Sequence, residues 1–92
     1  MSKNLWRLSQ INIMKDDIKT PKIKLGKYRH YKGNFYQVVG SALHSETLEP
    51  LVIYKPLYDS EVEYWVRPYD MFVGKVEHNG NILPRFELID EK

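Results

Sequence analysis

The stretch Lys27–Thr47, KYRHYKGNFYQVVGSALHSET, decides the fold class, because aromatic and β-branched residues alternate with polar ones on both sides of a glycine turn. Residues 27–31 predict a first strand, since aromatic side chains favour a pleated surface. Residues 32–34, Lys-Gly-Asn, predict a tight turn, because glycine and asparagine tolerate a positive φ. Residues 35–45 predict a long second strand, in which Gly40 indicates a bulge or a bend.

After this stretch the sequence predicts two further strands and one helical turn. Residues 51–57 are expected to form a third strand whose end, at Pro56, lies at an edge or a bulge, because proline cannot donate to a β-ladder. Residues 62–67 are expected to form a fourth strand. Residues 68–72 predict one turn of helix, because a leading proline suits the first position of a helical turn.

The predicted fourth strand has two faces of different character. Its alternating side chains form an apolar set and a more polar set, namely Val62, Tyr64 and Val66 against Glu63, Trp65 and Arg67. The apolar set is expected to face the core, because burial of apolar surface drives folding. Met71 and Phe72, the bulky apolar pair of the helical turn, are expected to plug one end of the domain.

The end of the chain predicts a last pair of strands. Asn79-Gly80 is a strong hairpin signal between residues 73–78 and residues 82–88. About five short strands, frequent turn signals and one late helical turn predict an all-β domain, a small closed or half-closed SH3-like barrel over residues 25–92. A barrel also removes the exposed edges that a short open sheet would present.

Residues 1–24 lack the β pattern and are expected to form a separate N-terminal leader. Residues 1–32 hold nine Lys or Arg against two Asp, a net of +7, and residues 33–92 hold five against ten acidic residues, a net of −5. A basic N-terminal segment before an acidic remainder favours contact with phosphates. A nucleic-acid-binding module that uses the leader and Trp65 is therefore one candidate function. The competing interpretation is a lysine-rich segment that simply solvates the chain.

The composition limits the class of protein. The chain has 92 residues, which is the size of one domain, and 42% of them are hydrophobic, as in folded proteins. It contains no cysteine, which excludes disulfides and thiolate chemistry and favours a cytoplasmic location. No apolar run approaches the roughly 20 residues of a membrane span, so no membrane partner is predicted.

Three motifs occur in order along the chain: YRHYKG at Tyr28–Gly33, HSET at His44–Thr47 and WVRPYDMF at Trp65–Phe72, with PRFE following near the end. In these motifs the chain resembles a family of small, mainly bacterial proteins known only as a numbered domain of unknown function. The resemblance runs from about Lys24 to Ile89. It implies an SH3-type barrel and brings no established activity.

His30, His44 and Glu46 are the candidate residues for chemistry. His44 and Glu46 are two positions apart and would share one face of a strand, and His30 adds a third ligand of the kind that zinc or iron accepts. A small metal- or nucleotide-dependent enzyme is therefore the alternative function. The competing interpretation is that His44 hydrogen-bonds the loop that follows it, where Ser45 and Thr47 also cap backbone amides. Because the sequence does not show that the two histidines and the carboxylate converge, and because it has no glycine-rich phosphate loop, we predict neither a metal nor a cofactor.

A second set of residues predicts a binding surface. Trp65 and Arg67 share one face of the fourth strand, and together they offer a flat π surface and a bidentate donor for an anion. Such a pair suits a peptide, a nucleotide or single-stranded nucleic acid. We therefore predict a non-catalytic binding or interaction module, and the candidate ligand-binding residues are Tyr28, His30, His44, Glu46, Trp65 and Arg67. If Trp65 is a core residue instead, Arg67 is expected to pair with an acidic neighbour.

The leader provides the first test. Leu5, Leu8 and Ile11 have helical spacing, and the linker that follows contains Pro21. A short isolated helix is marginal in water, and terminal segments that bury little surface add little stability. Deletion of residues 1–13 should therefore leave the melting temperature, measured by circular dichroism, within a few degrees of the full chain. A large drop would mean that the apolar side chains of the leader dock on the barrel.

Overall fold

The computed structural model describes residues 21–92, and the helix and linker expected before residue 21 lie outside this range. The elements in chain order are β1 (Gly26–His30), β2 (Phe35–Leu43), β3 (Pro50–Pro56), β4 (Trp65–Pro68), α2 (Tyr69–Phe72), β5 (Lys75–His78), β6 (Asn81–Pro84) and β7 (Phe86–Glu91). Within the described range no helix is long and apolar enough to span a membrane.

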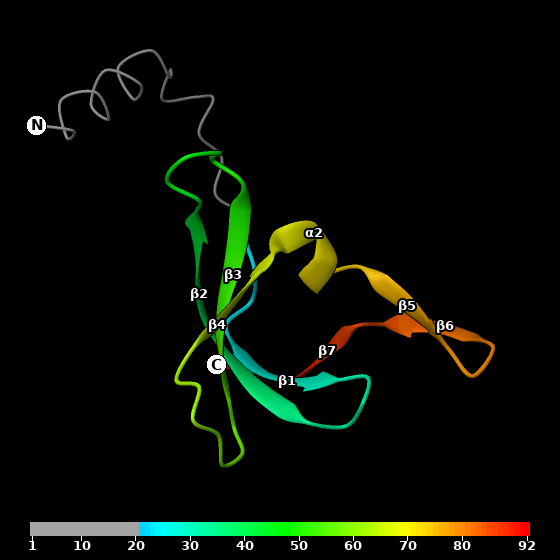
Figure 1. Cartoon of the computed structure of the whole chain (residues 1–92). Coiled ribbons are helices and arrows are strands. Elements are labelled where there is room, and N and C mark those ends of the chain that lie inside the picture. Colours follow the sequence, from blue (N-terminus) through cyan, green and yellow to red (C-terminus); the bar gives the residue numbers. More distant parts are fainter. Residues whose placement is uncertain (1–20) are drawn as a thin grey trace, which may run out of the picture.

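The strands form one five-stranded antiparallel sheet in the order β4-β3-β2-β1-β7, together with a separate β5–β6 hairpin. The hairpin projects away from the larger sheet, and α2 lies between β4 and β5 (Figure 1). The prediction of an all-β, SH3-like barrel with one late helical turn is confirmed. The described part of the chain contains seven strands rather than about five, and the last predicted strand is divided into β6 and β7.

The local signals in the sequence produce the expected turns and bends. The β2–β3 register shifts between Val38 and Gly40, which is the predicted bulge. Gly33 in the β1–β2 turn has φ 112°, and Asn79 and Gly80 in the β5–β6 turn have φ 53° and 80°, the left-handed values that a tight hairpin requires. Pro56 lies at the end of β3, beyond the last residue that pairs with β4, so its missing N–H leaves no gap in that ladder.

The core is small and mostly aromatic, and Phe72 is at its centre. Phe72 is 1% exposed, its ring stacks on Phe86 with centroids 4.0 Å apart, and Tyr28 and Tyr54 meet it edge to face at 5.4 and 5.3 Å. Offset-stacked and edge-to-face arrangements are those that aromatic quadrupoles favour. The buried side chains of the described range are Tyr28, Val38, Val52, Tyr54, Phe72 and Phe86.

The predicted core side of the fourth strand is wrong, and the strand is shorter than expected, because residues 62–64 precede β4. Tyr64 and Val66 are 51% and 57% exposed. The β3–β4 register places Trp65 opposite Tyr54 and Arg67 opposite Val52, and residues directly opposite each other share a face of the sheet. Since Tyr54 and Val52 are buried, the more polar set of β4 side chains lies on the concave side.

Two further expectations need correction. The sequence predicts that both Met71 and Phe72 plug one end of the domain. Met71 is 47% exposed, so only Phe72 of this pair is buried in the core. The predicted strand over residues 82–88 is interrupted at Arg85, whose backbone N–H donates to the Gly74 carbonyl. This break lets β6 pair with β5 while β7 pairs with β1.

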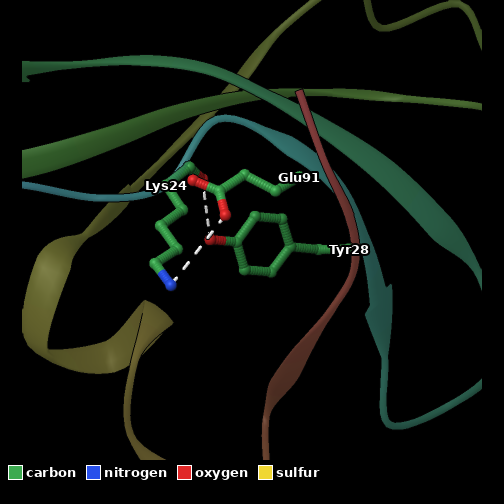
Figure 2. A network of polar contacts seen from close by, with 3 residues as sticks. All are labelled: Lys24, Tyr28 and Glu91. Atoms are coloured by element: carbon green, nitrogen blue, oxygen red, sulfur yellow. Dashed lines mark hydrogen bonds and ion pairs between the residues drawn. The ribbon is translucent and has the colours of Figure 1, made fainter.

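Tyr28 ties the segment before β1 to the barrel. Its hydroxyl donates a hydrogen bond to the Lys24 carbonyl at 2.7 Å, and the Lys24 ammonium lies 3.9 Å from the Glu91 carboxylate (Figure 2). The ion pair is exposed and contributes little, whereas the hydrogen bond satisfies the hydroxyl of a buried ring. Gly26 is required nearby, because a Cβ at this position would collide with the Asp90 carbonyl oxygen. Residues 21–24 therefore run along the barrel, and Ile23 packs against the core.

The central position of Phe72 gives a test of the core. Phe72→Ala should lower the free energy of unfolding by about 3–5 kcal/mol, the usual cost of removing a buried aromatic ring. The neighbouring Met71→Ala is the control and should change it by less than about 1 kcal/mol, because surface substitutions cost little. Urea unfolding of both variants measures the difference. Equal effects would place the two side chains in equivalent environments and contradict the assigned core.

Candidate functional site

An open depression of about 570 Å³ lies on the concave side of the sheet, and we refer to it as the aromatic groove. It lies between the β1–β2 turn on one side and β4 on the other, with side chains from α2 and from the start of β7. Its lining residues are His30, Tyr31, Lys32, Tyr36, Tyr54, Tyr58, Trp65, Val66, Arg67, Pro68, Met71, Arg85 and Phe86.

The floor of the groove is made of Tyr36, Tyr54 and Phe86, whose rings meet pairwise edge to face at 5.4–5.7 Å. Tyr54 and Phe86 belong to the core, so the floor is held rigidly by the packing beneath it. The Tyr36 and Tyr58 hydroxyls are 3.1 Å apart. Burial, and then this hydrogen bond, raise the pKa of Tyr36 to about 12, so its hydroxyl stays protonated at neutral pH.

Three cationic side chains line the aromatic groove, and no carboxylate does. Arg67 Nε donates to the Tyr54 hydroxyl at 3.1 Å, and its guanidinium lies 5.7 Å from the Phe86 ring centroid. Arg85 Nε donates to the Met71 carbonyl at 3.1 Å. The one ion pair recorded within residues 21–92 joins Lys24 to Glu91, so the positive charge of the groove, to which Lys32 also contributes, is not neutralised there.

His30 lies beside these cations in a defined orientation. Its Nδ1 accepts a hydrogen bond from the Lys32 backbone N–H at 3.2 Å, so in the neutral ring the proton is on Nε2. The ring also packs edge to face on Phe86 at 4.8 Å. Burial lowers the pKa of His30, and the positive charges of Arg67, Arg85 and Lys32 lower it further. The imidazole is therefore neutral at pH 7 and offers an Nε2–H donor.

The structure brings together three of the six predicted site residues. His30, Trp65 and Arg67 all line the aromatic groove, because the β1–β7 and β3–β4 registers place them on the concave face. Tyr28 lies on the same face but is buried in the core and does not line the groove. Arg67 bonds to a tyrosine hydroxyl rather than to the acidic neighbour expected for a buried Trp65, which is 44% exposed.

His44 and Glu46 lie elsewhere and have a structural role in their loop. The His44 Nδ1 accepts the backbone N–H groups of Glu46 and Thr47 at 3.1 and 3.4 Å, which is the loop-capping interpretation. His30 precedes β2 and His44 follows it, so nine residues of strand, roughly 30 Å, separate them. No group of three or more His, Asp or Glu in the described range is arranged to hold a metal ion. The structure therefore does not bring His30, His44 and Glu46 together into the single metal site considered for them.

Sequence reasoning missed several groove residues. Tyr36 lies on β2 and Tyr58 follows β3, and the β2–β3 register, which pairs Tyr36 with Pro56, brings their hydroxyls together. Arg85 and Phe86 reach the groove because β7 pairs with β1, with Phe86 opposite His30. Closure of a barrel by its first and last strands was the one signal that could have placed the PRFE segment beside His30.

Residues 26–88 match the family described as "Protein of unknown function (DUF1653)". The chain belongs to the DUF1653 family. Its structure is similar to the crystal structure of a DUF1653 protein from Bordetella bronchiseptica, with 30% sequence identity and a TM-score of 0.71 over 77% of this chain and 92% of that one. No functionally curated protein matches the chain. The predicted resemblance is thus confirmed at the level of the family.

The environment of His30 in this DUF1653 protein gives a test by titration. The NMR signal of its imidazole Cε1–H should titrate with a midpoint below the ordinary value of about 6.5. Arg67→Gln should move that midpoint upward, because removal of a positive neighbour favours the charged imidazole. A midpoint at or above 6.5 in the unmodified protein would contradict the assigned burial and charges.

The same shift has a consequence for stability. Because the pKa of His30 is lowered in the folded state, the unfolded chain binds more protons just below pH 6.5. The contribution of His30 to stability is therefore complete above that pH and is lost as the pH falls through the folded pKa. The free energy of unfolding, measured in urea, should differ less between pH 7 and pH 5 in His30→Gln than in the unmodified protein.

Proposed function

We propose that this DUF1653 protein is a non-catalytic binding module that holds an anionic ligand in the aromatic groove. The observation that carries the proposal is the charge of the lining: three cations, no carboxylate and a rigid aromatic floor. Positive side chains at the rim of a low-dielectric surface attract anions and concentrate the field there. His30, Trp65 and Arg67 are the proposed contact residues from the predicted set, with Arg85 and Lys32 added by the fold.

The chemistry of the lining supports binding rather than catalysis. The groove supplies N–H and O–H donors, positive charge and flat apolar surface, and these groups recognise a ligand without reacting with it. His30, its one imidazole, uses Nδ1 to accept the Lys32 N–H, so the ring presents a donor rather than a base. Activation of a nucleophile needs a base within hydrogen-bonding reach of a hydroxyl, thiol or amine, and the recorded partner of Nδ1 is a backbone amide.

The charge of the described domain also supports a local anion site. Residues 21–92 hold ten Lys or Arg and ten Asp or Glu, a net charge of zero. A polyanion is attracted by a broad excess of positive charge. Here the three cations of the groove belong to a domain with no net charge, which favours a small anion. A cytoplasmic location is part of the proposal and rests on the cysteine-free sequence.

A pair of matched charge variants tests the proposed function. A set of small phosphate esters and carboxylates, screened by ¹H–¹⁵N NMR, should shift the side-chain signals of Trp65 and Arg67. Arg67→Gln should weaken the best binder about tenfold or more, because a hydrogen bond to a charged group contributes roughly 1.5–3 kcal/mol.

The control for that experiment is Arg29→Gln. Arg29 carries the same charge, lies on β1 beside His30, and points to the opposite face of the sheet, away from the groove lining. The control should bind like the unmodified protein. If no anion shifts the groove signals, or if the two variants lose affinity equally, the proposed function is wrong.

A further inference from the structure

Trp65 has an unusual position for the largest side chain of the described domain. It lies on the concave face opposite the buried Tyr54, yet it is 44% exposed. The other groove aromatics pack in ring pairs, and no ring within residues 21–92 is recorded against the Trp65 indole. A flat indole that is fixed on a strand and lacks a ring partner is a ready stacking surface.

The cations lie at a definite spacing from this surface. Arg67 is two residues beyond Trp65 on the same face of β4, about 6.6 Å along the strand backbone, so the two side chains are neighbours on the groove side. Arg85 and Lys32 line the same groove. Because Arg67 and Arg85 use Nε for their recorded bonds within the described chain, their terminal nitrogens are available to an anion.

Trp65 and the groove cations together define the ligand more closely. We infer that the aromatic groove binds a single nucleotide unit, with its base stacked on Trp65 and its phosphate held by Arg67 and Arg85. This inference rests on the proposed function. A terminal phosphate carries a charge of about −1.5 to −2 at pH 7, which matches three cations better than the single charge of a carboxylate. Base stacking on an aromatic side chain adds about 1–3 kcal/mol of affinity.

The flanking charge favours one nucleotide unit within the groove. The segment between β3 and β4, which leads directly into Trp65, carries Asp59, Glu61 and Glu63. These carboxylates would repel the phosphates of further nucleotides at that end of the groove. The chemistry is shared by two sources, a free nucleoside 5′-monophosphate and the phosphorylated 5′ end of a strand.

NMR titration with three related probes tests the inference. AMP should bind at least about fivefold more tightly than ribose 5-phosphate, the factor that corresponds to 1 kcal/mol of stacking, and adenosine should bind weakly. If ribose 5-phosphate binds as tightly as AMP, the groove is an anion site alone; the inference fails and the proposed function stands. If neither these probes nor any other small anion binds, both fail.

A matched pair of aromatic variants locates the base. Trp65→Ala should reduce the affinity for AMP to that for ribose 5-phosphate, while the affinity for ribose 5-phosphate stays unchanged. Tyr64→Ala is the control, because Tyr64 is the adjacent exposed aromatic and does not line the groove. Equal losses of AMP affinity in the two variants, or no loss in Trp65→Ala, would overturn the placement of the base. The NMR spectrum of each variant confirms that it is folded.

Short oligonucleotides distinguish the two sources. A tetranucleotide with a 5′-phosphate should bind as AMP does if the groove accepts a strand end, and should not bind if the groove accepts the free mononucleotide alone; either result agrees with a single-unit site. A tetranucleotide without the 5′-phosphate should not bind. If it binds more tightly than AMP, with an affinity that falls steeply with salt, the groove is a single-strand site and the inference is wrong.

Discussion

The stack of Phe72 on Phe86 is the contact on which the rest of the structure depends. Phe86 begins β7 and pairs opposite His30 at the end of β1, while Phe72 ends the helical turn after β4. The contact therefore joins the two outer strands of the sheet through its concave side, with ring centroids 4.0 Å apart. A domain this small has few buried side chains, so one aromatic pair contributes a large part of the stabilisation of the core.

The same contact prepares the candidate site. Phe86 is at once the partner of Phe72, the edge-to-face neighbour of His30 and the ring beneath the Arg67 guanidinium. The groove floor is thus the outer surface of the core, and its geometry is fixed before any ligand arrives. Preorganisation of this kind would lower the entropic cost of the proposed binding, because the side chains that line the groove are already held in place.

The motifs of the chain divide between scaffold and site. The HSET segment shapes its own loop through the Nδ1 of His44, far from the groove. The YRHYKG segment contributes to both, since Tyr28 is buried in the core while His30 and Lys32 line the groove. In WVRPYDMF, Trp65 and Arg67 line the groove and Phe72 fills the core. Side chains two residues apart on one strand thus differ in role, because Tyr28 is covered by the core while His30 lies at the open groove.

The sequence by itself determined the fold class, the turns, the bulge near Gly40, the helical turn and the placement of Trp65 and Arg67 on one shared face of their strand, because these follow from local periodicity and turn chemistry. It could not determine which face of β4 is inward. That choice depends on the register with β3, which pairs Trp65 with the buried Tyr54. Tyr64 and Val66 therefore lie on the opposite, exposed face, although they are apolar. Nor could it separate His30 from His44 or add Arg85 to the groove. These placements arise only when β7 pairs with β1 and the sheet curls, which brings together residues more than fifty positions apart in the chain.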